Sequence, residues 1–324
     1  KMVDYSGNKN VAATITSGLD IPGGTGTGTV VDVVDPLIEK VNTSANPISK
    51  TGTLEFKISD RYLGNSTPDT TKIKILVDGT VNNSISKTLD KIEDQTETRV
   101  EGGKTSTVKI GATYKLSISG FTAEANQVKV RFESGFISDS NSNSNKETEI
   151  ILYNVLKSTA TETSDTSGFL GNTNIARQDV DSVTFVNSIS SDVYDKSAGQ
   201  YTDSTVWDVS AQGDKSIVAW YTQNANGSYT VYIGSDYEIF GNMDSSYLFS
   251  QIGRSSKCTS TETIKNLALL NTTGINKMNS MFAYTGYNAM VNLNLEDKFD
   301  TSNVTEMNNM FAYCGYNAMT DFAL

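Results

Sequence analysis

The chain has 324 residues, with 26 Lys and Arg against 37 Asp and Glu, and its net charge at pH 7 is −11. An acidic chain without a basic run is a poor candidate for binding nucleic acid or inserting into an anionic membrane. Histidine is absent, which removes the usual general base, the Ser-His and Cys-His pairs and most zinc sites. We therefore expect two or three domains and no enzymatic activity.

The first 31 residues precede the first regular strand pattern. Residues 1–17 contain a turn followed by a strand-like run, and their Asp/Asn spacing at 4–10 is repeated at 139–145. This echo predicts that residues 1–17 are the end of a preceding copy of the module that follows. Residues 18–31 form a Gly/Thr tract without periodicity, which we interpret as a flexible linker.

Residues 32–156 alternate between apolar and polar side chains, as Leu54, Phe56 and Ile58 do along one short segment. About seven such segments, separated by Gly, Asp and Asn turns, predict a β-sandwich. The opening run Asp-Pro-Leu-Ile-Glu-Lys-Val at 35–41 and the Asp/Asn-rich loop before the last strand resemble bacterial Ig-like surface modules. The resemblance implies an Ig-like β-sandwich of the kind arrayed in stalks.

Two further segments separate this module from the C-terminus. Residues 157–178 are rich in Ser and Thr, and we expect a linker there. Residues 179–259 hold aromatic-rich strands with the hairpin turn Asn226-Gly227, and they predict an antiparallel β cap module.

An internal repeat occupies residues 260–324, where the segment 275–290 recurs 29 residues later as 304–319. Within one unit, a Leu-x-Leu motif predicts a short strand, and Val304, Met307, Met310 and Phe311 share one stripe of a helix. A unit of this size buries a core only when copies stack, so the sequence predicts a strand-helix solenoid. The fold class expected for the whole chain is mainly β.

The stretch 299–314 resembles the signature of BspA-like leucine-rich repeats: Phe-Asp-Thr-Ser-Asn-Val-Thr, then Met, Met-Phe and Cys. The earlier repeat departs from it, with Thr285 where the later one has Cys314. The resemblance implies a secreted, extracellular protein of the bacterial cell surface, an adhesin without catalysis or cofactor, with a host or neighbouring-cell protein or glycan as partner. We also expect an incomplete array, with more repeats and modules in the whole protein.

Four tyrosines recur in register in this repeat: Tyr284, Tyr287, Tyr313 and Tyr316. On the face of a solenoid they would form a ligand-binding surface. Packing between repeats is the alternative role for the same side chains.

One loop offers oxygen ligands at alternate positions: Asp139, Asn141, Asn143 and Asn145. This spacing suits calcium, whereas an Asx-rich hairpin turn explains the same residues without a metal.

Two functions remain open from the sequence. In the first, an Ig-like stalk presents the leucine-rich repeats for adhesion. In the second, the chain is a subunit of an extracellular filament or surface layer that binds copies of itself, with residues 1–17 donated as a strand to a neighbour.

Overall fold

The computed structural model describes residues 32–101, 103–122, 124–295 and 299–320. The expected end of a preceding module (1–17) and the Gly/Thr tract (18–31) lie outside the described residues, as does the strand donation that the filament alternative requires. The described chain is mainly β, as the sequence predicted. Its helical elements are three 3-10 helices of three residues each: Thr70–Lys72, Arg177–Asp179 and Leu267–Leu269.

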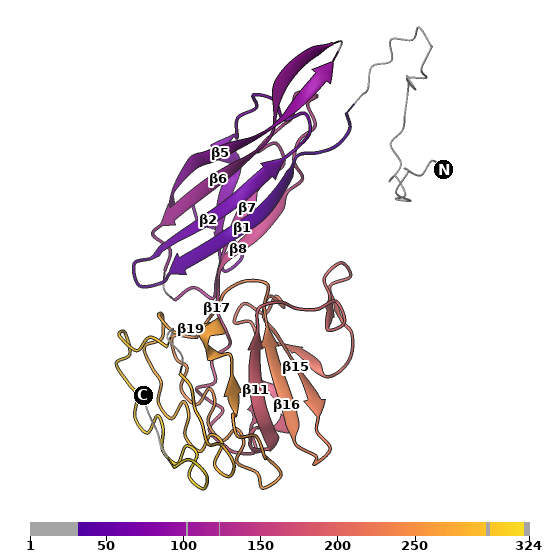
Figure 1. Ribbon diagram of the computed structural model, residues 1–324. Coiled ribbons are helices and arrows are strands. Elements are labelled where there is room, and N and C mark those ends of the chain that lie inside the picture. Colours follow the sequence, from indigo (N-terminus) through magenta and orange to yellow (C-terminus); the bar gives the residue numbers. More distant parts are fainter. Residues whose placement is uncertain (1–31, 102, 123, 296–298, 321–324) are drawn as a thin grey trace.

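Residues 32–156 form a sandwich of two four-stranded antiparallel sheets, the upper unit in Figure 1. The order in the first sheet is β1 (Leu37–Asn46), β2 (Thr51–Ser59), β6 (Lys104–Ser119) and β5 (Ser86–Glu101). The order in the second sheet is β4 (Thr80–Val81), β3 (Ile73–Val77), β7 (Gln127–Phe132) and β8 (Thr148–Asn154). The sequence predicted about seven strands, and the structure has these eight.

The alternating pattern places the sandwich core between the two sheets. Leu54, Phe56 and Ile58 of β2 are fully buried, and Phe56 packs on Phe132 of the opposite sheet at 4.6 Å between ring centroids. The far half of the β5–β6 hairpin, beyond Gly111, pairs with no third strand of the described chain and projects from the end of the sheet (Figure 1). The hydrophobic periodicity therefore accounts for the sandwich, while the long hairpin is an addition to it.

A five-stranded sheet organises the C-terminal unit, residues 157–320. Its order is β14 (Val206–Asp208), β15 (Val218–Gln223), β16 (Tyr229–Gly234), β11 (Val180–Val186) and β18 (Ile264–Lys265). The first three strands form the antiparallel meander that the sequence predicted around Asn226-Gly227. Strand β11, however, pairs in parallel with both β16 and β18, so the sheet is mixed rather than antiparallel throughout.

The Ser/Thr-rich segment 157–178 is not a separate linker but part of the C-terminal unit. It carries the short strands β9 (Gly168–Phe169) and β10 (Asn172–Ala176), and the side chains of Phe169 and Arg177 are fully buried. The polar composition wrongly predicted a linker, because a few buried apolar residues and one buried cation are enough to anchor this segment.

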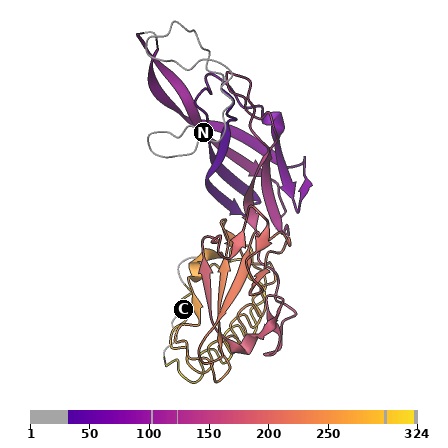
Figure 2. The same ribbon diagram turned by 90° about the vertical axis from the view of Figure 1, so that its right-hand side faces the viewer.

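Three segments of the C-terminal unit stack in parallel, and we call them rung 1 (243–253), rung 2 (276–286) and rung 3 (305–315). Parallel bridges pair Asp244 with Lys277 and Lys277 with Glu306. Every second amide of rung 2 from 278 to 284 donates to a carbonyl of rung 3, with N···O distances of 2.7 to 2.8 Å. Amides 245 to 251 of rung 1 donate to rung 2 in the same way, at 2.8 to 3.0 Å. Figure 2 shows the rungs as parallel loops beside the sheet.

The helix expected within each repeat is wrong. The Leu-x-Leu strand is also wrong at 267–269, a 3-10 helix, and at 293–295, which is not a strand, while its copy at 322–324 lies outside the described residues. Ser280, Tyr284, Asn309 and Tyr313 have φ between 53° and 61°, a left-handed conformation that an α-helix does not tolerate. Each rung is instead a series of tight turns. Alternate amides of rungs 1 and 2 donate hydrogen bonds to carbonyls of the next rung. Met307, expected on the inward helical stripe, is 44% exposed.

The stack also begins earlier than the sequence indicated, because rung 1 lies within the segment expected as the β cap. Three short strands complete the surroundings of the rungs: β17 (Ile239–Phe240), β19 (Leu270–Asn271), which pairs with it in parallel, and β18. A separate two-stranded hairpin consists of β12 (Tyr194–Asp195) and β13 (Gln200–Tyr201).

Candidate functional site

The interior of the rungs is filled by phenylalanine. Phe249, Phe282 and Phe311 occupy the same position in rungs 1, 2 and 3 and stack at centroid distances of 5.2 and 5.4 Å. Phe249 also meets Phe185 of β11 edge-on at 6.2 Å, which joins the stack to the sheet. The repeat core is therefore complete without its tyrosines.

The four tyrosines named from the sequence come together as two columns. Tyr284 stacks on Tyr313 at 4.8 Å, with an angle of 13° between the ring planes, and Tyr287 stacks on Tyr316 at 5.2 Å and 15°. The columns touch each other, since Tyr313 and Tyr316 lie 5.5 Å apart. Tyr313 and Tyr316 are 51% and 60% exposed, and no hydrogen bond within the described part of the chain uses the hydroxyl of any of the four.

The side chain of Arg254, which directly follows rung 1, extends this aromatic surface. The guanidinium of Arg254 lies over the Tyr284 ring at 4.6 Å from its centroid, within the range of a cation–π contact. The same guanidinium bonds Gln251 Oε1 at 2.7 Å and Asp165 Oδ2 at 3.2 Å. We call Arg254 and the four tyrosines the tyrosine surface.

An asparagine ladder runs beside the tyrosine surface. Asn317 Nδ2 donates to Asn288 Oδ1 at 2.9 Å, and Asn288 Nδ2 donates to the carbonyl of Arg254 at 2.7 Å. These hydrogen bonds link successive repeats, so the tyrosine rings are held in a fixed register. The arrangement presents flat aromatic rings, phenol hydroxyls and a guanidinium, which are the groups most often found at the centre of protein recognition sites.

The loop considered for calcium uses its side chains for its own hydrogen bonds. The carboxylate of Asp139 accepts from the amides of Asn141 and Asn143 at 2.8 Å each, and from Asn143 Nδ2 at 2.8 Å. Asn145, 1% exposed, accepts from the amide of Ile137 at 3.0 Å. These bonds lower the pKa of Asp139 although burial opposes them. They are the bonds of an Asx turn, the alternative explanation of this loop.

The structure adds two partners to Asp139 that the sequence did not bring together. Asp32, which precedes β1, and Asp60, which follows β2, each place a carboxylate oxygen so that the three residues' ligand atoms lie within 4.8 Å of one another. This cluster could not be predicted from the sequence, because its three residues are distant along the chain and come together only in the folded structure.

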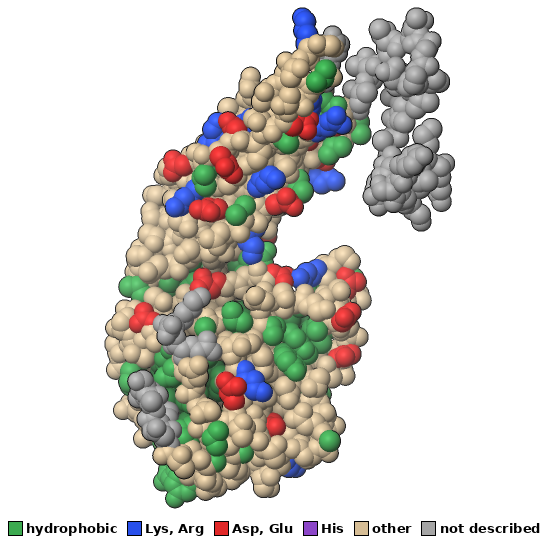
Figure 3. Space-filling model, in the orientation of Figure 1, with side chains coloured by type: hydrophobic (Ala, Val, Ile, Leu, Met, Phe, Trp, Pro, Cys, Tyr) green, Lys and Arg blue, Asp and Glu red, His purple; other side chains and the backbone are tan. Residues whose placement is uncertain are grey.

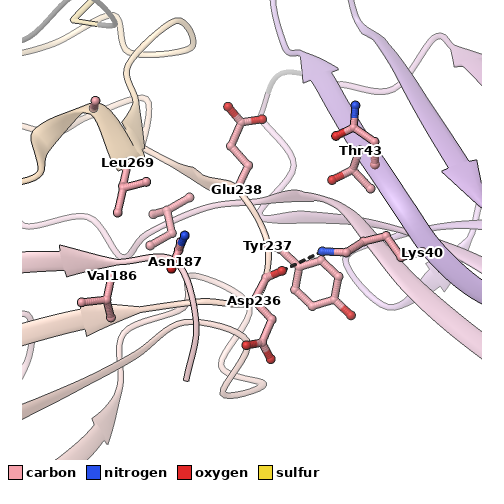
Figure 4. Close-up of a pocket in the computed structure, with 11 residues that line it drawn as sticks. Lys40, Thr43, Val186, Asn187, Asp236, Tyr237, Glu238 and Leu269 are labelled. Carbon is pink, nitrogen blue, oxygen red and sulfur yellow. Dashed lines mark hydrogen bonds between the residues drawn. The ribbon is translucent and has the colours of Figure 1, made fainter. Parts of the chain in front are cut away.

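A cleft of about 330 Å³ lies between the two units (Figure 4). Lys40 of β1 reaches across it, with Nζ 2.7 Å from the carbonyl oxygen of Asp236 and 4.5 Å from the centroid of the Tyr237 ring. Burial lowers the pKa of Lys40, and the nearby Asp236 opposes that shift. The carboxylates of Asp236 and Glu238 are engaged within the C-terminal unit, by Lys196 and Asn271, so of these charged groups only Lys40 joins the two units.

Comparison of the chain with protein-family models, with curated proteins and with solved structures finds no match. Among the described residues, no helix has the length and apolar character needed to cross a membrane.

Proposed function

We propose that this chain is a non-catalytic protein of the bacterial cell surface, in which an Ig-like sandwich serves as a stalk and leucine-rich repeats bind a ligand. The eight-stranded antiparallel sandwich supports the first assignment, and the parallel stack of rungs, 33 and then 29 residues apart, supports the second. The extracellular location rests on the resemblance of residues 299–314 to BspA-like repeats. Adhesion to a host or neighbouring-cell protein or glycan is the activity that this combination favours.

The observation that carries the proposal is the tyrosine surface. Its rings are not needed for the core, which phenylalanines already fill, and its hydroxyls have no hydrogen-bond partner in the described chain. Charged side chains gather over the sandwich on the face shown in Figure 3, whereas the C-terminal unit presents mostly uncharged surface there. An exposed aromatic surface with a single guanidinium at one side suits contact with a glycan or a protein.

Stacked repeats also explain how a weak contact becomes adhesion. The pair of rings at 284 and 287 recurs at 313 and 316, so a polymeric ligand contacts two equivalent positions at once. Binding at several linked positions raises the overall affinity by orders of magnitude over one contact.

The test is binding of the whole chain to a printed glycan array and to immobilised extracellular-matrix proteins. We expect binding to at least one member, and the double variant Tyr313→Ser/Tyr316→Ser is expected to weaken it by about tenfold or more, as loss of a central aromatic contact does. The matched control is Tyr194→Ser/Tyr201→Ser, which removes another tyrosine pair of the same unit, 5.8 Å apart beside Lys215. Equal binding by both double variants, or a lower melting temperature of the first without weaker binding, would assign the tyrosines to packing.

A further inference from the structure

The three carboxylates at the far end of the sandwich form a pocket of negative charge that the adhesion proposal does not use. Asp32 lies just before β1, Asp60 just after β2, and Asp139 in the loop between β7 and β8. Leu37 pairs with Ser59 at this end, which brings the chain before β1 next to the end of β2, and the ligand atoms of Asp32 and Asp60 lie within 4.8 Å of each other. The C-terminal unit lies at the opposite end of these strands (Figure 1).

Two oxygens in this cluster lack a partner. Asp60 is 6% exposed, and its Oδ2 is buried without a hydrogen bond, while its Oδ1 accepts from the amide of Tyr62. Asp32 Oδ2 is likewise buried and unpartnered. A buried anionic oxygen without a donor costs free energy, so a folded protein leaves one only where something else satisfies it.

Arg61 also lines the cleft beside Asp32 and Asp60, but in the described chain it pairs with none of the three carboxylates. Within the described residues, no lysine or arginine forms an ion pair with Asp32, Asp60 or Asp139. Three carboxylates within 4.8 Å of one another repel when all are ionised, and either a shared proton or a bound cation relieves that repulsion.

We propose that Asp32, Asp60 and Asp139 bind a divalent cation, and that calcium is its identity. All three ligands are carboxylates, the hard oxygen donors that calcium prefers. They come from three separate segments, and an open cleft lined by Asp32, Asp60 and Tyr62 lies beside them, so the remaining coordination positions are accessible to water. Such an adaptable set suits calcium better than magnesium, which demands near-ideal octahedral geometry.

The cation would tie three chain segments together where residue 32 joins the sandwich. Asn143 already holds this junction, because its Nδ2 donates to Asp139 Oδ2 and to the carbonyl of Asp32 at 3.1 Å. The calcium loop inferred from the sequence thus contributes one of its four residues, Asp139, as a ligand, while its neighbours position that ligand.

The experiment is calorimetric titration of the whole chain with calcium chloride after treatment with a chelator. We expect a dissociation constant on the order of 10⁻⁴ to 10⁻³ M, the range of extracellular calcium modules, and binding of magnesium at least about tenfold weaker. Asp60→Asn keeps the side-chain size and is expected to weaken calcium binding at least about tenfold. Without calcium, this variant should melt at or above the temperature of the parent chain, because it removes a repelled charge.

Two controls separate this site from other acidic surfaces. Asp90→Asn makes the same charge change at an exposed position of β5, and Glu39→Gln removes a carboxylate charge at an exposed position of β1; both should bind calcium like the parent. Terbium luminescence sensitised by Tyr62 gives a second readout, which calcium should quench by displacement. Absence of heat up to roughly 10 mM calcium, well above the expected range, or equal binding by Asp60→Asn and the parent, would overturn the proposal.

Discussion

Arg177 is a fully buried cation that ties the segment 157–178 to rung 1. Its guanidinium donates to the carbonyls of Tyr247 and Leu248 at 2.8 and 2.9 Å, and it lies 3.3 Å from Glu162 Oε2. Burial lowers the pKa of Arg177 to about 10, and the charge of Glu162 opposes this shift. Burial raises the pKa of Glu162, against the attraction of Arg177. The charged form of each side chain is therefore stabilised by the charge of the other.

Replacement of Arg177 by Met should destabilise the protein by about 3–5 kcal/mol, because Glu162 and the rung 1 carbonyls lose a buried partner. Urea-induced unfolding followed by circular dichroism measures this change. The control Arg254→Met breaks a half-exposed ion pair with Asp165 and should cost less than about 1 kcal/mol. Similar losses in the two variants would show that Arg177 contributes no more than a surface charge.

At the scale of the element, each rung ends in a glycine with a left-handed backbone, at positions 253, 286 and 315. Gly286 has φ of +58°, and a Cβ added there would lie 2.2 Å from Met290 Cβ. The chain turns sharply at this point, and the side chain of Met290 occupies the space beside it. Glycine is required here for both its backbone conformation and its lack of a side chain.

Gly286→Ala should therefore cost about 2–4 kcal/mol, the sum of a left-handed alanine and an overpacked contact. The matched control is Gly227→Ala, where φ is +78° but an added Cβ would meet open space, so only about 1–2 kcal/mol is expected. Thermal unfolding of the two variants gives the difference. If Gly227→Ala proves as costly as Gly286→Ala, the close contact with Met290 contributes nothing.

The sequence predicted elements well where hydrophobic periodicity alone decides the structure. The alternation of apolar and polar residues predicted β2 and its neighbouring strands correctly, because side chains of a half-buried strand point alternately to the core and to solvent. In the rungs, the same stripe of Met and Phe suits a helix or a chain of turns, and hydrogen bonds to the next rung decide between them. Rung 1 was missed because Gln251 and Arg254 stand where the later rungs have tyrosines.

The candidate sites were predictable to different extents. The tyrosine surface follows from the repeat register, since equivalent positions of stacked copies must lie above one another. The acidic cluster does not, because Asp32, Asp60 and Asp139 meet only through strand pairing and a loop between sheets. The sequence singled out Asp139 together with its loop neighbours, whereas the structure also brings Asp32 and Asp60 close to it.

At the scale of the whole molecule, the two units share a hydrophobic contact instead of a free linker. Strand β8 leads directly into the C-terminal unit, where Val155 forms a parallel bridge with Phe240. Phe240 is fully buried and packs on Tyr153 of the sandwich at 4.6 Å, as part of the sandwich core. Lys129 and Asp214 add an ion pair across the junction at 3.0 Å. The two units are therefore joined by packing, a backbone bridge and an ion pair.

Phe240→Ala should separate the unfolding of the two units, because it removes the ring that completes the sandwich core from the C-terminal side. Differential scanning calorimetry should show one transition for the parent chain and two for the variant, with a total loss of about 3–5 kcal/mol. Phe136→Ala deletes a ring of the same size inside the sandwich alone, so it should lower the transition without dividing it. Two transitions in the parent, or one in the Phe240 variant, would mean that the units unfold independently of this contact and that the junction is no stiffer than an ordinary linker.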